Sequence, residues 1–253
     1  MPTGLFRWVA VEQNEFTAAV GASGSGKSTR GGFMKRHLLW VLPLCVFLAA
    51  MAFGMIKRQT YKDIFEQKNY LDQLTVAELP EDFVERQCAI LSERLPQVPV
   101  ILRVEVEGEI EHLFHVDRQK IIIREVYAGE GLAAGEEYYL FSRSWSVALN
   151  EQINSLERGF VNILKVGEEY LIFATEVLPD LNGDLSAIKL YDEYLISPVF
   201  CYEECENVIS PLLGETLGVP YKDVKNNEFF AASEKGMKML KEFKGKMLSL
   251  YPR

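Results

Sequence analysis

The sequence has 253 residues and a formal net charge of −9 at pH 7, and a chain of this length allows one sizeable domain. The charge is uneven: residues 1–58 hold seven basic and two acidic residues, whereas residues 59–253 hold 20 and 34, a net charge of −14. The strong negative charge of residues 59–253 argues against nucleic acid and anionic lipid as partners of this part of the chain.

A phosphate-loop motif stands near the N-terminus, where the string GASGSGKST fits the pattern G-x-x-x-x-G-K-[ST]. In a folded loop of this type, backbone N–H groups hold phosphates, Lys27 reaches the outer phosphates and Ser28 ligates magnesium. The nucleotide-binding residues of such a site are Gly21, Gly24, Gly26, Lys27, Ser28 and Thr29.

The longer string EFTAAVGASGSGKST resembles the phosphate-loop region of ABC-transporter ATPases of the lipoprotein-export and peptide-export type. The resemblance ends at Thr29, because Gly31 and Gly32 disfavour the helix that should follow. No apolar strand ending in Asp-Glu and no LSGGQ-type signature appears downstream. We therefore interpret residues 1–33 as an ATPase fragment that is not a folded domain, joined to a product that starts at Met34. The alternative is an ATP-binding protein that uses Lys27.

Residues 34–58 are predicted to form a transmembrane anchor. The run from Leu38 to Ile56 has 19 residues without a charge and is framed by Lys-Arg pairs. As a helix it spans ~28 Å, close to the ~30 Å hydrocarbon core of a bilayer. A buried core helix is the alternative, but such a helix keeps a polar stripe that this run lacks.

The orientation of the anchor follows from the order of features after Met34: basic residues, an apolar run and then small residues at Ala50 and Ala52. This is the order of a secretory signal, and it places the C-terminal part outside the cytoplasm. Because apolar residues continue to Ile56, we favour an uncleaved single-pass anchor in the cell membrane over cleavage after Ala52.

Residues 59–97 are predicted to be a helical stalk, with one helix before the break at Leu79-Pro80 and another after it. The second helix places Val84, Cys88 and Leu91 on one face. Such a face also suits simple packing against the following domain, which is the alternative that we prefer.

Residues 98–205 change to strand chemistry. Apolar residues alternate from Val98 to Val106, and four further strand-like runs follow, separated by glycine-bearing turns: LFHVDRQKIIIREVYAG, EEYYLFS, LKVGEEYLIFATEV and AIKLYDEYLISPVF. Five strands with such turns indicate a small barrel. The expected fold class is α+β, with one transmembrane helix, an extracytoplasmic OB-like barrel and flanking helices.

The runs IIIREVYAGEGLAAGEEYYL and LKVGEEYLIFA are similar to the OB-fold of the netrin and tissue-metalloprotease-inhibitor superfamily. The matching positions are Val126 to Gly129, Gly135 to Leu140 and Val166 to Leu171. Inhibitory members reach a metal with an N-terminal cysteine. This domain has no cysteine at its start, so the resemblance implies the fold and not that activity.

Two further features flank the barrel. Tyr138, Tyr139, Phe141 and Trp145 could line a ligand groove, but alternation puts Tyr139 and Phe141 on one face and favours core packing. Residues 206–253 are predicted to be a C-terminal helical extension, whose helix begins after a Ser233 cap.

The chain has four cysteines, of which Cys88, Cys201 and Cys205 lie beyond the anchor, and they could form one disulfide. A zinc site at Cys201 and Cys205 lacks a fourth ligand, since His112 and His115 point to opposite faces of a strand. We expect no metal, no cofactor and no catalytic residues.

The expected function is that of a membrane-anchored binding or accessory module, not an enzyme. Its expected partner is an ABC exporter or another envelope protein, because the N-terminal fragment resembles an exporter subunit. A tethered inhibitor or sensor of an envelope enzyme is the alternative.

Overall fold

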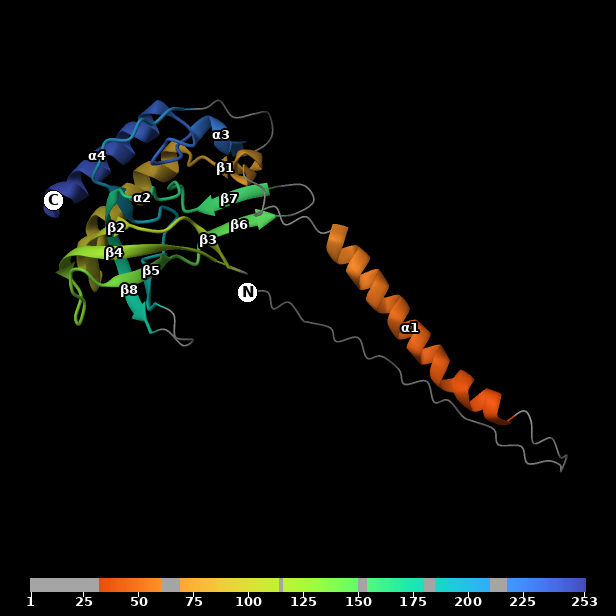
Figure 1. The fold of residues 1–253 in the computed structure, drawn as a ribbon. Coiled ribbons are helices and arrows are strands. Elements are labelled where there is room, and N and C mark those ends of the chain that lie inside the picture. The colour runs from red at the N-terminus through yellow and green to blue at the C-terminus, as the bar shows by residue number, and fades with distance from the viewer. Residues whose placement is uncertain (1–31, 61–68, 114–115, 150–153, 180–184, 210–217) are drawn as a thin grey trace, which may run out of the picture. The chain divides into compact units, whose positions relative to one another are not determined.

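The computed structural model describes residues 32–60, 69–113, 116–149, 154–179, 185–209 and 218–253 (Figure 1). The chain divides into two compact units, Met1–Lys62 and Asp63–Arg253. The predicted nucleotide-binding residues from Gly21 to Thr29 lie outside the described residues, as do residues 61–68 of the predicted stalk.

Helix α1 spans Gly32–Thr60 and includes the uncharged run from Leu38 to Ile56. It begins at Gly32, so this glycine starts a helix where the sequence predicted a break. Large apolar side chains of α1 are exposed: Val41, Leu44, Val46, Phe47, Leu48, Met51, Phe53, Met55 and Ile56. A search of the described residues finds no helix that is long and apolar enough to cross a membrane.

The second unit is an α+β domain built on a five-stranded barrel. Its strands pair in the order β8-β2-β4-β5-β9, and β9 pairs with β8 to close the ring. All neighbours are antiparallel except β5 and β9. The barrel strands are β2 (Val100–Val106), β4 (Asp117–Ala128), β5 (Glu137–Phe141), β8 (Glu169–Leu178) and β9 (Ala187–Leu190). This mixed five-stranded barrel is consistent with an OB-like fold, as the sequence predicted.

Alternation explains why these residues form a barrel. In β4, Asp117, Gln119, Ile121 and Ile123 are buried while the residues between them are half-buried. Leu102 of β2 lies opposite Ile172 of β8 and Val126 of β4, and is fully buried. The buried side chains of β2 and β4 therefore contribute to the core of the barrel.

Short strands add to this barrel. Strand β3 (Glu111–His112) pairs with β4, and β10 (Val199–Cys201) pairs with β8. The run AIKLYDEYLISPVF, predicted as one strand, is thus two strands joined by a loop. A four-stranded sheet has the order β11-β1-β7-β6, with strands β1 (Thr75–Ala77), β6 (Trp145–Leu149), β7 (Asn154–Arg158) and β11 (Gly218–Pro220). The sequence did not predict this sheet.

Helices α2 (Glu81–Arg94) and α4 (Glu234–Leu250) pack against each other and contribute to the barrel core (Figure 1). In α2, Val84 and Leu91 are fully buried. Residues 70–97, assigned above to a stalk, therefore belong to the folded domain, as the packing alternative expects. They include β1, α2 and the 3-10 turns η2 (Tyr70–Gln73) and η3 (Leu95–Gln97).

The C-terminal helix begins where the sequence predicted. Ser233 Oγ accepts a hydrogen bond from Gly236 N at 3.0 Å and so caps α4. Met237, Leu240, Phe243 and Met247 form the buried stripe of this helix. The short helix α3 (Tyr221–Val224) precedes α4 and packs in a second small core with β1 and β11.

Candidate ligand-binding cavity

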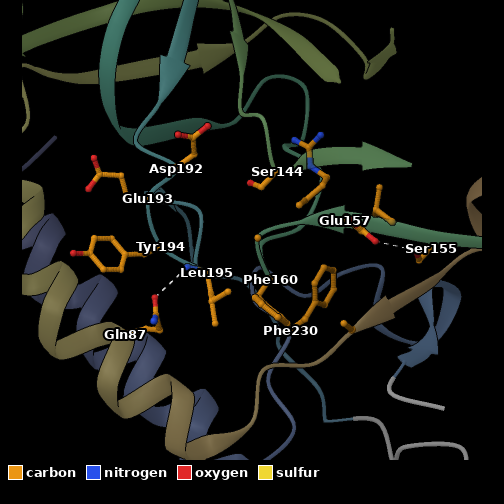
Figure 2. A pocket seen from close by; sticks show the side chains of 14 residues that line it. Gln87, Ser144, Ser155, Glu157, Phe160, Asp192, Glu193, Tyr194, Leu195 and Phe230 are labelled. Carbon is orange, nitrogen blue, oxygen red and sulfur yellow. Dashed lines mark hydrogen bonds between the residues drawn. The ribbon is translucent and has the colours of Figure 1, made fainter. Parts of the chain in front are cut away.

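A cavity of about 550 Å³ lies within the second unit, between β1, α2, β7 and the loop that joins β9 to β10. Figure 2 shows its lining. Leu195 is held over the cavity because its backbone N–H donates to Gln87 Oε1 of α2 at 3.1 Å. A volume of this size is typical of sites that bind small molecules or the side chains of a partner.

One side of the cavity is apolar. Leu195, Phe160 and Phe230 lie close together there (Figure 2), and Leu156 and Ala77 complete the apolar lining. Leu195 is 45% exposed although it is a large apolar residue. This surface therefore offers contact area to an apolar group that enters from solvent.

Carboxylates lie on other sides of the cavity. Asp192 Oδ2 accepts a hydrogen bond from Arg143 N at 3.2 Å, and its charge is paired with Arg143 and Lys189. Glu157 and Glu193 are exposed, and the structure gives them hydroxyl partners, Ser155 and Tyr191. Negative charge is thus available to a cationic group at the rim.

Arg158 is the basic residue of the described lining, and it is 2% exposed. Its guanidinium lies 3.8 Å from the ring centroid of Trp145, and Nη2 donates to Gln119 Oε1 at 3.0 Å. Within the described part of the chain, Nε and Nη1 have no hydrogen-bond partner. Burial lowers the pKa of Arg158 to about 10, and the charge of Asp117 opposes that shift, so the side chain remains a cation at neutral pH.

The turn after β7 brings Phe160 into the cavity. Gly159 has φ +61°, and Phe160 has φ 58°, an uncommon value for a residue with a side chain. A Cβ at Gly159 would lie 2.4 Å from Ser197 Oγ. Gly159 O also accepts from Ser197 N at 2.9 Å. The cavity wall is thus held by a turn that requires glycine.

A hydrogen-bonded chain of Tyr70, His112 and Asp117 lies outside the cavity lining. Tyr70 Oη is 2.5 Å from His112 Nε2, and His112 Nδ1 is 2.7 Å from Asp117 Oδ1. The order resembles that of a nucleophile, a base and an orienting acid. However, burial and the charge of Asp117 raise the pKa of Tyr70 to about 12, so the phenol is a poor nucleophile at neutral pH. We interpret the chain as structural.

The structure places the other candidate residues as follows. Trp145 is fully buried and donates to Ser197 Oγ at 2.9 Å, so it belongs to the core and not to an aromatic groove. Tyr139 lies under the guanidinium of Arg118, 3.5 Å from the ring centroid. His115 lies outside the described residues.

One cluster in the described residues could ligate a metal: Glu168, Cys201 and Cys205, whose ligand atoms all lie within 4.8 Å of one another. It supplies three donors, whereas structural zinc sites have four. The sequence had identified both cysteines, but Glu168 is 33 residues away from Cys201 and gave no signal.

The chain has no match among known protein families or curated proteins.

Proposed function

We propose that this chain is a membrane-anchored binding module, not an enzyme, whose OB-like domain holds a segment of an envelope protein in the 550 Å³ cavity. The segment carries an apolar side chain next to Lys or Arg. The observation that supports this most is the combination of an exposed apolar surface around Leu195 with the carboxylates of Glu157 and Glu193.

Charge and shape both favour such a segment. An apolar side chain would contact Leu195, Phe160 and Phe230, and a neighbouring cation would be attracted to the exposed carboxylates. The net charge of −14 over residues 59–253 adds a long-range attraction for a cationic partner. An anionic segment would meet repulsion at the same rim.

The location of the module is part of the proposal. The uncharged run from Leu38 to Ile56, together with the exposed apolar side chains of α1, supports a single-pass anchor with the domain outside the cytoplasm. The fragment before Met34 supports an ABC exporter as the partner. Kinship with the netrin and tissue-metalloprotease-inhibitor superfamily is a proposal that rests on the strings around Tyr127 and Tyr170.

Selection from a library of displayed random peptides on the immobilised full chain tests the specificity. We expect the selected peptides to be enriched in an apolar residue beside Lys or Arg. The double variant Glu157→Gln/Glu193→Gln should weaken their binding roughly tenfold, because each of the two exposed charge pairs contributes up to ~1 kcal/mol and a loss of ~1.4 kcal/mol corresponds to tenfold. Glu109→Gln/Glu130→Gln, outside the cavity lining, is the control. Selection of acidic peptides, or equal loss in both double variants, would refute the proposal.

A further inference from the structure

A second cavity, of about 440 Å³, opens beside Cys205 and is separate from the ligand-binding cavity in its lining. Lys244, Lys241, Glu228 and Glu203 contribute to its wall. Cys205 is half-buried in the segment that follows β10, whereas Cys201, the last residue of β10, is fully buried. A reagent in this cavity therefore meets the sulfur of Cys205 first.

The two sulfur atoms lie within 4.8 Å of each other. A disulfide needs them ~2.05 Å apart, so one must move by up to about 3 Å. Cys201 is held in place, because β10 pairs with β8 and the Cys201 backbone N–H donates to Glu228 Oε1 at 2.8 Å. Cys205 lies in irregular chain, so rotation of its side chain and a small backbone shift can close the gap.

We propose that Cys201 and Cys205 form a reversible disulfide, made by exchange with a disulfide-containing oxidant that enters the cavity at Cys205. The proposal does not depend on the function assigned to the other cavity.

The environment distinguishes the roles of the two sulfurs. Cys205 is half-buried and lines the cavity together with Lys244, whose positive charge favours a thiolate. Cys201 is fully buried, and its thiol donates to Glu168 Oε2 at 3.3 Å. Cys205 is therefore the attacking thiolate, and Cys201 resolves the intermediate.

The exchange has two steps. The Cys205 thiolate attacks one sulfur of the oxidant, forms a mixed disulfide and releases the other half as a thiolate. The Cys201 thiol then transfers its proton to Glu168, whose Oε2 lies 3.3 Å from Cys201 Sγ, and attacks Cys205 Sγ. The second half of the oxidant leaves as a thiolate. Two protein thiols are oxidised, one disulfide is reduced to two thiols, and the two protein protons balance the released thiolates.

Oxidised glutathione is the probe, applied to the full chain, followed by acid quenching, alkylation of free thiols and mass spectrometry of tryptic peptides. The peptide of residues 190–222 contains both cysteines and no internal cleavage site. We expect the oxidised peptide to be lighter by two hydrogen atoms and to carry no alkyl group. Cys88 should resist oxidation, because burial raises its pKa to about 11, and it should therefore still be alkylated after the quench. In the reduced chain, iodoacetamide should modify Cys205 about tenfold faster than Cys88.

Serine variants test the order of attack. Cys201→Ser should leave glutathione bound to Cys205, since the resolving sulfur is gone. Cys205→Ser should leave Cys201 as a free thiol. The wild-type mass measurement keeps the test valid if a variant does not fold. The proposal would be overturned if Cys201 and Cys205 are both still alkylated after oxidation, or if either of them pairs with Cys88. Glutathione on Cys201 in the Cys205→Ser variant would also overturn it.

Discussion

An ion pair joins helix α4 to the segment that precedes it, and we expect its loss to be destabilising. Lys244 Nζ lies 2.6 Å from Glu228 Oε2, and the two side chains are 14% and 4% exposed. Lys244→Met keeps the apolar stem but leaves a buried carboxylate without its cation. Breaking a buried pair in this way costs about 3–5 kcal/mol. Since Glu228 keeps the hydrogen bond from Cys201 N and borders a cavity, we expect the lower end, about 3 kcal/mol at pH 7.

The loss should depend on pH. Burial raises the pKa of Glu228 even with Lys244 present, and removing the cation raises it further. A carboxyl group with a raised folded pKa binds its proton in the folded state where the unfolded chain has lost it, so stability falls as pH rises through that window. The loss of unfolding free energy caused by Lys244→Met should therefore shrink as pH falls from 7 to 5, by up to about 1.4 kcal/mol per pH unit.

Urea unfolding of the full chain at pH 5, 6 and 7, followed by the fluorescence of the buried Trp145, measures the effect. Lys246→Met is the matched control, because Lys246 is an exposed lysine of the same helix. A loss of unfolding free energy below 1 kcal/mol at pH 7, or a loss that does not change with pH, would refute the reasoning.

Three other predictions follow from single residues. Leu102→Ala, at a fully buried barrel position, should lower the free energy of unfolding by about 3 kcal/mol in the same urea assay. Gly159→Ala should destabilise more than Gly131→Ala: both glycines have positive φ, but only at Gly159 does a Cβ collide with Ser197, and equal melting temperatures would contradict this. ATP binding should be undetectable in the wild type and in Lys27→Ala alike, because the resemblance to ATPases ends at Thr29. Micromolar ATP binding by the wild type that Lys27→Ala abolishes would contradict the interpretation.

The barrel could be predicted because its residues carry local signals. Alternation from Leu102 to Val106 and from Asp117 to Arg124 reports directly which face is buried. The α4 helix was equally readable, because a serine cap precedes an apolar stripe of period 3.6.

The four-stranded sheet could not be predicted, because its strands carry no local signal in the sequence. β1 and β11 have three residues each, and β1 pairs with β7 from 80 positions away. Strands this short leave no period to detect, and their stability comes from pairing across the domain. The polar character of the 142–163 region hid β6 and β7 in the same way.

The cavity could not be predicted from the sequence either. Its residues come from β1, α2, β7 and the loop between β9 and β10, and Leu195 is held by Gln87, 108 positions earlier. A ligand site of this kind is a property of tertiary packing, so the sequence led to the hypothesis of a binding module but not to its surface.

Photocrosslinking from the cavity in native membranes is the most direct test of the proposed binding. A benzoylphenylalanine at position 195, in place of the exposed Leu195, should capture an envelope protein through a segment with an apolar residue beside Lys or Arg. Capture should fall when Glu157 and Glu193 are changed to Gln, and the same photoreactive residue at Val166, exposed and outside the cavity lining, should not give this product. Equal products from both positions, or a captured segment without a cationic residue, would contradict the proposed binding.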